Sequence, residues 1–375
     1  MSQEIEYSIR SEARRLGFAA CGFAKAEPVS GEMARVLDRW TDSHYHAGMQ
    51  YMERNRHLRL DPTLLVPGCQ TLIVVALNYY PKKPLPPEGY QIAYYAYGKD
   101  YHRVVKDRLH QLLAYIRTLA PEVEGRAFCD TAPLLERYWA VRAGIGFIGL
   151  NRTLIIPGQG SYCFLGVLAV NLPLGEEVAS SIPFRGGVTS STAMGAAPSP
   201  WEPTRKERRL RRLLVYQHQG VCFGSLAGGE ASPIFACGQC KRCLMACPTG
   251  ALTRDGIDCR RCLSYLTIEH RGPIPEEIGK KMGRRIYGCD TCQRVCPHNR
   301  NAQSTEETAF AMPPEVAALT PEEWQALTPE RYKALFGDSA IERAGYEGLM
   351  RNIAQADATA PNRMYNPNLN EKPKE

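Results

Sequence analysis

The sequence predicts an α+β protein, and three observations carry this prediction. Residues 1–174 alternate between helical and strand-like hydrophobic patterns, as expected for an α/β domain. Nine cysteines lie between Cys237 and Cys296, in runs of the kind that ferredoxins use to hold iron–sulfur clusters. Helix-start signals recur near the carboxyl end. We therefore expect an α/β domain at 1–174, a ferredoxin-like domain at 236–300, and a helical segment at 301–375 that ends in a disordered tail.

Composition excludes several classes of protein. Of the 375 residues, 44% are hydrophobic and 9% aromatic, which is enough to build packed cores and excludes a disordered chain. No apolar run approaches the roughly 18 residues of a membrane span, and the first residues lack the order of a signal peptide. We therefore expect the 14 cysteines to be reduced, in the cytoplasm. The net charge of +7 is compatible with a polyanionic partner but does not require one.

The first elements follow from hydrophobic periodicity. Apolar residues at helical spacing predict a helix from Ser2, and Gly17 ends it before a short strand at 18–21. The continuous apolar and β-branched run Thr71–Asn78 is typical of a central strand that is covered on both faces. Apolar residues on one side of the segment 101–119 predict a long amphipathic helix.

Asp130 directly follows a short predicted strand at 127–129 and precedes a predicted helix that carries residues 134–138. A carboxylate at the carboxyl end of a strand often faces a ligand crevice. The alternative is that Asp130 or Thr131 only caps the helix, with Pro133 in its first turn. The residues by themselves leave both interpretations open.

Glycines recur at 143–149, with the sequence AGIGFIG, before a second apolar run at 164–170. Glycine permits close approach of the backbone to a ligand, but these glycines do not show the spaced dinucleotide-binding pattern. Close packing against other segments is the alternative, and we favour it.

The cysteine runs predict two cubane clusters. Residues 237–248 read CGQCKRCLMACP, and in bacterial ferredoxins the first three thiolates of such a run hold one cluster while the fourth serves the other. Residues 289–297 read CDTCQRVCP, which repeats the pattern without its first cysteine. Zinc also uses paired Cys-x2-Cys units, but three cysteines within seven residues, with each run followed by proline, fit clusters better.

The predicted ligands fall into two sets of four. The first set is Cys237, Cys240, Cys243 and Cys296. The second set is Cys247, Cys289, Cys292 and either Cys259 or Cys262. We choose Cys262, because it opens the apolar segment 263–268, whereas Cys259 lies in a polar stretch.

Residues 175–235 are rich in Ser, Gly, Pro and Ala and show no helical or strand period, so we expect a low-complexity, unordered insertion. A basic run at 205–214 predicts either a solvated patch or a contact with RNA. Beyond the cysteines, Thr320 and Thr328 each precede Pro and Glu, which predicts two short helices. A third helix is expected over about 339–353.

Four motifs, together with the first cysteine run, resemble the epoxyqueuosine reductase family. The motifs are residues 130–137 (DTAPLLER), 143–149 (AGIGFIG), 262–272 (CLSYLTIEHRG) and 287–292 (YGCDTC). The resemblance implies a cobalamin-dependent oxidoreductase with two [4Fe-4S] clusters, related to the reductive dehalogenases. Members of this family reduce epoxyqueuosine to queuosine at the wobble position of tRNAs with GUN anticodons. The eight cysteine ligands chosen above agree with the family's pattern.

The resemblance also implies roles for individual residues. Asp130 matches the family's proton donor to the departing oxygen. The residues expected at the cobalamin are Arg59, Tyr101, His102, Asp130, Asn151 and Ser264. For Tyr101, a structural role at the start of its helix is the alternative. The chain departs from the family in having Leu150 where a lysine is common, in the length of its 175–236 connection, and in lacking helical repeats at its carboxyl end.

His44 and His46 lie in the sequence DSHYHAG, residues 42–48. This segment nearly matches the Asp-x-His-x-x-Gly signature of proteins that ligate cobalt through histidine. The glycine comes one position late, so we interpret both residues as surface histidines.

The expected partners are a tRNA anticodon stem-loop and an external electron donor, and we expect a monomer without a membrane association. Epoxide reduction takes electrons that side chains cannot supply, so the clusters must deliver them. Two rival functions share part of this pattern, namely a dehalogenase-like reductase of a small molecule and a plain iron–sulfur electron carrier. The long α/β region before the cysteines argues against the carrier.

Overall fold

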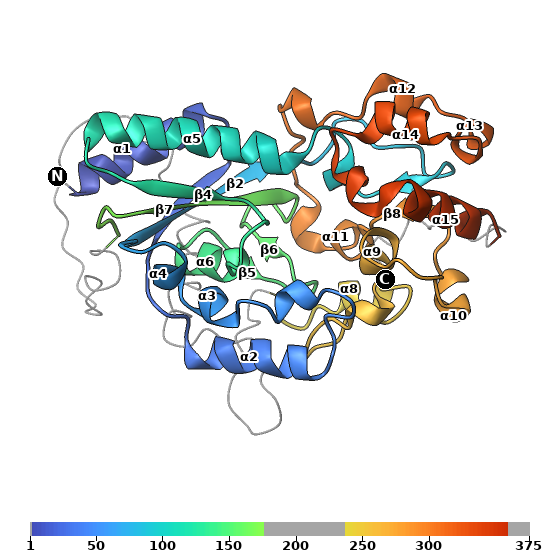
Figure 1. The fold of residues 1–375 in the computed structure, drawn as a ribbon, viewed down its shortest axis with the longest axis horizontal. Coiled ribbons are helices and arrows are strands. Elements are labelled where there is room, and N and C mark those ends of the chain that lie inside the picture. The colour runs from blue at the N-terminus through green and yellow to red at the C-terminus, as the bar shows by residue number, and fades with distance from the viewer. Residues whose placement is uncertain (1, 176–236, 359–375) are drawn as a thin grey trace, which may run out of the picture.

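A four-stranded antiparallel sheet organises the N-terminal half of the chain (Figure 1). The computed structural model describes residues 2–175 and 237–358. The strand order is β1-β2-β7-β4, with β1 at Ala20–Lys25, β2 at Thr71–Asn78, β7 at Cys163–Val170 and β4 at Gly125–Phe128. The prediction of a central strand at 71–78 is therefore confirmed. The helices and strands do alternate as predicted, but the three strand pairs of this sheet are antiparallel rather than parallel as in a typical α/β sheet.

Helices cover both faces of this sheet, as Figure 1 shows. Helices α1 (Ser2–Arg15) and α5 (Tyr101–Leu119) lie on one face, and α6 (Glu136–Arg142) lies on the other. Side chains along a strand alternate between faces. Ile73 and Val75 of β2 accordingly enter the core under α1 and α5, whereas Leu72 and Val74 pack in the core that contains Trp139 of α6. Two apolar cores explain why β2 reads as a continuous apolar run although the sheet is antiparallel.

The antiparallel order gathers three loops at one end of the sheet. Both β2 and β4 run antiparallel to β7, so their carboxyl ends meet the amino end of β7. Asn78 pairs with Cys163, and Phe128 pairs with Val167. The segments that follow β2 and β4 and the segment that precedes β7 therefore lie at the same end of the sheet.

The helix after Asp130 begins later than predicted. Helix α6 starts at Glu136, and Leu135, whose side chain makes no capping hydrogen bond, is its N-cap residue. Leu134 is buried ahead of the helix. The capping alternative for Asp130 and Thr131 is thus wrong, because the chain makes a turn between the strand and the helix instead of entering the helix at Pro133.

Of the glycines in 143–149, Gly146 and Gly149 pack against protein, whereas Gly144 has open space around it and a left-handed φ of +71°. A Cβ at Gly146 would overlap with the carbonyl of Ile155, which lies in strand β6. Strand β6 (Leu154–Ile155) pairs with β5 (Phe147–Ile148) in a small second sheet. The packing interpretation of Gly146 is confirmed.

The segment 237–358 packs beside the end of the sheet and is mostly made of short helices, with one short strand and one longer helix. A third small sheet joins the two parts of the chain, because β8 (Arg285–Tyr287) pairs in parallel with β3 (Gln91–Ile92). The two predicted Thr-capped helices are confirmed as α13 and α14. The third helix, expected over about 339–353, is observed as α15 at Gly345–Ala358, because residues Ala340–Ala344 form a 3-10 helix instead. The remaining helices are α2 (Gly31–Asp42), α3 (Arg56–Leu60), α4 (Pro62–Leu65), α8 (Arg242–Ala246), α9 (Leu263–Ile268), α10 (Glu276–Gly279), α11 (Thr291–Arg294), α12 (Pro314–Ala317), α13 (Pro321–Gln325), α14 (Pro329–Phe336) and α15 (Gly345–Ala358).

Several predictions concern residues outside the described ranges. The insertion predicted at 175–235, its basic run and the disordered tail after 358 lie outside the described residues, apart from Gly175. Within 2–175 and 237–358, no helix combines the length and the apolar character that a membrane span requires.

Candidate active site and metal centres

Asp130 lies where the chain leaves β4 at the end of the sheet. Its backbone adopts the left-handed conformation, with a φ of +53°. Residues other than glycine adopt this conformation rarely, and often at functional sites. The side chain of Asp130 is 68% exposed. The turn after β4 therefore presents a carboxylate beyond the end of the sheet instead of burying it.

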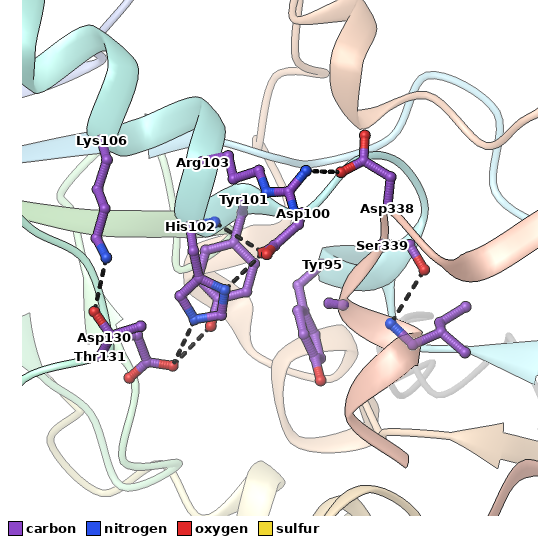
Figure 2. A network of polar contacts seen from close by, with 12 residues as sticks. Tyr95, Asp100, Tyr101, His102, Arg103, Lys106, Asp130, Thr131, Asp338 and Ser339 are labelled. Carbon is purple, nitrogen blue, oxygen red and sulfur yellow. Dashed lines mark hydrogen bonds and ion pairs between the residues drawn. The ribbon is translucent and has the colours of Figure 1, made fainter. Parts of the chain in front are cut away.

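The first turn of α5 brings two predicted site residues to Asp130 (Figure 2). The Tyr101 hydroxyl donates a hydrogen bond to Asp130 Oδ2 at 2.7 Å, and His102 Nε2 lies 3.9 Å from the same oxygen. Asp100 caps the helix by accepting the His102 backbone N–H at 3.0 Å, and its Oδ1 lies 2.6 Å from His102 Nδ1. Asp100 therefore orients the imidazole toward Asp130.

Tyr101 is held by ring stacking as well as by its hydrogen bond. Its ring stacks on Phe164 with centroids 4.2 Å apart, and on His102 with centroids 4.0 Å apart. Burial, together with the Asp130 carboxylate, raises the pKa of Tyr101 far above its ordinary value. The hydroxyl therefore stays protonated and remains a donor to Asp130. A structural role at the start of the helix and a contact with the site coexist in this residue.

The C-terminal segment supports the start of α5. Arg103 Nη1 lies 2.7 Å from Asp338 Oδ1, and the Asp100 N–H donates to the Asp338 carbonyl at 2.8 Å (Figure 2). A Cβ at Gly98 would overlap with the carbonyl of Ala309, so this close approach requires glycine. The position of Tyr101 and His102 thus depends on contacts from residues more than 200 positions later.

Glu136 opens α6 and closes the loop that carries Asp130. Its Oε1 accepts the backbone N–H of Asp130 at 2.6 Å. Burial, followed by the nearby Asp130 carboxylate, raises the pKa of Glu136 to about 8. Lys106 of α5 contacts the same loop, because its Nζ donates to Thr131 Oγ1 at 2.9 Å. The sequence patterns assigned no role to Glu136 or Lys106, although Glu136 lies within the 130–137 motif.

Arg59 and Asn151 are buried polar residues on two other segments. Arg59 in α3 is 6% exposed, and Asn151, shortly after β5, is 4% exposed. Within the described part of the chain, neither Arg59 Nε nor Asn151 Nδ2 has a hydrogen-bond partner. Buried N–H groups are rarely left in this state. A corrin carries amide side chains that accept hydrogen bonds, so both residues fit the cofactor that the sequence predicts.

Tyr51 contacts Arg59 and lies within electrostatic range of Asp130. Its backbone carbonyl accepts a hydrogen bond from Arg59 Nη2 at 2.9 Å. Burial raises the pKa of Tyr51 to about 12, and the carboxylates of Glu269 and Asp130 contribute to this shift. The sequence patterns offered no signal for Tyr51, because a tyrosine in a short irregular segment matches no motif that we used.

The predicted site residues are thus brought together in part. Direct contacts join Asp130 to Tyr101 and His102, whereas Arg59 and Asn151 stand on separate segments. Ser264 lies in the first turn of α9, where it is partly buried.

The cysteines of 237–296 gather in two groups. Burial, and then nearby thiols of the same group, raise the pKa of Cys237, Cys243, Cys296, Cys262 and Cys292. The first group is Cys237, Cys240, Cys243 and Cys296. The second group is Cys247, Cys262, Cys289 and Cys292. Four thiolates are the ligand number of a [4Fe-4S] cluster. The two groups therefore fit one cluster each.

Cys259 is buried and lies near one member of the second group. Its thiol interacts with Cys262 next to it, and burial raises its pKa to about 12. We expected a polar environment here, yet Cys259 is only 7% exposed. Cys259 is buried because its polar neighbours bond each other and not the thiol: Arg260 Nε donates to Asp258 Oδ1 at 2.9 Å. The Cys259 N–H donates to the Tyr45 carbonyl at 2.8 Å.

Backbone N–H groups favour the thiolate form of Cys247. Burial alone would raise the pKa of this thiol, but hydrogen bonds from the backbone at Leu252 and Thr249 outweigh burial and lower it. A thiolate is the form that ligates iron. The loop after Cys247 is therefore arranged to receive a metal centre.

The cluster region packs on the same end of the sheet as Asp130. Gln293, in the second cysteine run, donates from Nε2 to the Ser161 carbonyl at 3.0 Å and to the Tyr79 hydroxyl at 3.1 Å. Asn299 Oδ1 accepts the Ser161 N–H at 2.7 Å. Tyr79 directly follows β2, and Ser161 lies just before β7. Buried hydrogen bonds thus fix the ligand-bearing segment to the scaffold that presents Asp130.

The prediction that His44 and His46 both lie on the surface is wrong for His46. His46 is 3% exposed, and its Nε2 lies 3.1 Å from Glu53 Oε1. His44 and Ala47 adopt left-handed backbone conformations, which fold the chain back after α2 and turn His46 inward against Trp40. His44, His46 and Glu53 offer donor atoms within 4.8 Å of one another, but the contact between His46 Nε2 and Glu53 Oε1 accounts for this arrangement without a metal.

Two family models match the chain. The model described as "Epoxyqueuosine reductase QueG, DUF1730" matches residues 59–131, a range that contains Asp130 and the start of α5. The model described as "4Fe-4S double cluster binding domain" matches residues 236–299, which contain both cysteine runs.

Curated relatives match over nearly the whole chain. An epoxyqueuosine reductase of Leadbetterella byssophila is 38% identical over 354 residues, which cover 94% of this chain and 98% of the relative. The epoxyqueuosine reductase of Escherichia coli (strain K12) is 32% identical over 366 residues, which cover 96% of this chain and 82% of the relative.

Solved structures share the fold. An epoxyqueuosine reductase crystallised with an epoxyqueuosine-modified tRNA-Tyr stem loop has a TM-score of 0.74 at 25% identity, over 96% of this chain and 82% of the other. A Bacillus subtilis structure, whose catalytic aspartate loop is swung out of the active site, has a TM-score of 0.73 at 25% identity with the same coverage. With these relatives, the chain belongs to the epoxyqueuosine reductase family of oxidoreductases, and its residues 236–299 form a domain for two [4Fe-4S] clusters.

Proposed function

We propose that this chain reduces epoxyqueuosine to queuosine at the wobble position of tRNA, with electrons from two [4Fe-4S] clusters and with cobalamin as the second cofactor. One observation carries the proposal. The cluster region packs on the end of the sheet where Asp130 is presented, so an acid and an electron source lie on one scaffold. The family membership supplies the substrate.

Asp130 is proposed to protonate the departing epoxide oxygen. Removing this oxygen as water takes two electrons and two protons, and a positioned carboxylic acid is suited to the proton transfer. The Tyr101 hydroxyl engages Asp130 Oδ2, so we expect the other carboxylate oxygen to face the substrate. The Bacillus subtilis relative has a catalytic aspartate loop that can leave its active site, and we propose that the loop of Asp130 corresponds to it.

The two ligand sets are proposed as the sequence predicts them. The first cluster is assigned Cys237, Cys240, Cys243 and Cys296, and the second is assigned Cys247, Cys262, Cys289 and Cys292. The gathering of the thiols into these two groups supports the assignment. We further propose domain limits at 1–174, 236–300 and 301–375.

Cobalamin is proposed to lie against Arg59 and Asn151, whose buried N–H groups would donate to the amides of the corrin. Tyr101, His102 and Ser264 are proposed as further contacts. When bound, cobalamin supplies the electron transfer to carbon that no side chain performs. The residues of the chain hold it, exclude water and position the acid.

The proposed partners are a tRNA anticodon stem-loop and an external electron donor that reduces the clusters. The stem loop in the related crystal structure supports the first of these. We propose that the chain acts as a monomer, in the cytoplasm, where tRNA is modified.

A direct assay tests the function. Protein reconstituted without oxygen is mixed with cobalamin, a chemical reductant and an anticodon stem-loop that contains epoxyqueuosine, and the nucleosides are analysed by mass spectrometry. We expect queuosine to form, only when cobalamin is present, and to form more slowly as salt rises, because Lys and Arg contacts with phosphate release counterions. Equal turnover of the free epoxide nucleoside, independent of salt, would instead support the dehalogenase-like reductase of a small molecule.

A further inference from the structure

Glu136 is the residue that closes the loop after β4 on itself. Its side chain reaches back six positions and accepts the backbone N–H of Asp130 at 2.6 Å. Asp130 has a left-handed φ of +53°. Residues other than glycine adopt this backbone conformation only with support from their surroundings. The hydrogen bond therefore acts on the backbone of the one residue in this loop that most needs it.

Two donors from another part of the chain contact side chains of the loop. The Tyr101 hydroxyl bonds the Asp130 carboxylate at 2.7 Å, and Lys106 Nζ bonds Thr131 Oγ1 at 2.9 Å (Figure 2). Both of these donors come from α5. Glu136 comes from α6, on the opposite face of the sheet, so the loop is held from two sides.

We propose that Glu136 is a positioning residue that latches the Asp130 loop, and with it the carboxylate of Asp130, against Tyr101 and His102. The inference rests on the proposed role of Asp130 as the proton donor. Glu136 itself transfers no proton in this proposal. It fixes the backbone from which the acid projects.

The charge state of Glu136 affects this latch. Burial and the Asp130 carboxylate raise the pKa of Glu136 to about 8, and they outweigh the Asp130 N–H, Arg137 and Lys106, which favour the ionised form. Tyr101 and Cys129 also face Glu136, and its charge raises the pKa of each. Neutral Glu136 accepts the N–H without repelling the Asp130 carboxylate. Ionised Glu136 still accepts the N–H but repels that carboxylate. The latch is therefore expected to hold the carboxylate in place below about pH 8 and to hold it less well above this pH.

Amide hydrogen exchange tests the latch without reference to activity. The cluster-loaded enzyme is compared with Glu136→Leu, which removes the acceptor, and with Glu136→Gln, which keeps a neutral acceptor of the same size. We expect the peptide that spans 129–135 to exchange faster in Glu136→Leu, by the equivalent of about one amide, and to keep its protection in Glu136→Gln. Glu122→Leu, a change at an exposed glutamate before β4, serves as the matched control and should leave this peptide unchanged.

Kinetics provide a second readout. Glu136→Leu should lower kcat by roughly 10²-fold, the effect of a small displacement of a catalytic group, with little change in KM, and Glu136→Gln should recover most of this loss at neutral pH. In the parent enzyme kcat should fall as pH rises through about 8, and Glu136→Gln should remove that decline. A role in folding alone would not move the pH profile of a variant that folds normally.

Two outcomes would overturn the latch. One is unchanged protection of the 129–135 peptide in Glu136→Leu, and the other is a Glu136→Gln enzyme that keeps the decline of the parent above pH 8. If Glu136→Leu does not fold, the pH profile of Glu136→Gln still decides. An Asp130→Asn enzyme of full activity would remove the proposed proton donor and leave the exchange result valid, so failure of the function and failure of the latch are distinguishable.

Discussion

The sheet and the cluster region meet at the end of the sheet where Asp130 lies, but their interiors are of different kinds. Strands β2 and β7 are eight residues each, and nearly all of their side chains are buried in two apolar cores. Helices α8 and α11 of the cluster region have five and four residues. Around them, small apolar groups enclose thiols, such as the group of Leu150, Cys243 and Val295.

This difference indicates where the stability of each part comes from. Burial of apolar surface is sufficient to hold the sheet and its helices. Helices of four or five residues are not stable by themselves, so the cluster region depends on its contacts with the sheet and on metal–thiolate bonds. The end of the sheet holds Asp130 in a hydrogen-bond network that forms without a cofactor. The cysteine thiols, in contrast, are arranged to bind iron, and iron binding completes the fold of the cluster region.

Removal of iron should have the largest effect, and it should affect the cluster region but not the sheet. Anaerobic oxidation with chelation is expected to increase amide exchange throughout 237–299, because the metal–thiolate bonds replace an apolar core there. Strands β2 and β7 should keep their protection. The measurement is hydrogen exchange followed by mass spectrometry, before and after chelation. Cys69→Ser, at a buried thiol outside both groups, is the control and should retain iron and the parental pattern. An even increase across both regions would break the comparison.

Asp130→Asn should separate chemistry from metal binding. The amide keeps the size of the side chain and an acceptor for Tyr101 but has no acidic proton. We expect turnover of the tRNA substrate to fall by about 10²–10⁴-fold, the range for a removed general acid, with iron content and melting temperature unchanged. Single-turnover rates and iron analysis measure both parts. Asp107→Asn, at an exposed position of α5, is the matched control. Parental turnover in Asp130→Asn would require another acid near the corrin.

Elements with a strong local pattern were predictable. Residues 71–78 and 101–119 match β2 and α5 as observed, because uninterrupted apolar runs and one-sided helices report burial directly. The cysteine runs could also be recognised in the sequence, because the cluster fixes the spacing of its ligands within each run. The order of strands was not, because β7 inserts between β2 and β4 through contacts distant in sequence.

The turn at Asp130 shows why the rest could not be predicted. Pro133 and the acidic residues around it match a helix start, and this local pattern competes with a hydrogen bond between Glu136 and the Asp130 backbone. Similarly, His46 is buried because the turn after α2 folds it against Trp40. In both cases the deciding contact involves a backbone conformation that no composition or period reveals.

Cys262→Ser and Cys259→Ser should differ in iron content. About eight irons are expected per chain, and Cys262→Ser should lose one cluster whereas Cys259→Ser should keep both. Cys262 interacts with Cys289 and Cys247, whereas Cys259 interacts with Cys262 alone among the described thiols. Burial of Cys259 makes this pair a stricter test than the sequence suggested, because Cys259 is buried and Cys262 is partly buried. Iron analysis and spin-resonance spectra distinguish the variants, and equal losses would contradict the assignment of the eighth ligand.

The smallest expected effect is on the pH dependence of the melting temperature, and it comes from Glu136. Glu136 has a folded-state pKa of about 8 against an ordinary value of 4.5, so the folded protein holds a proton that the unfolded chain releases. Its contribution to stability is complete below about pH 4.5 and is lost as pH rises through about 8. Glu136→Gln cannot titrate, so its melting temperature should rise relative to the parent between about pH 5 and pH 9. The thiols titrate in both proteins, and their effect cancels in the difference. A melting-temperature difference that stays constant with pH would show that Glu136 is ionised at neutral pH, and the alkaline sensitivity of the molecule would then lie in the cluster region instead.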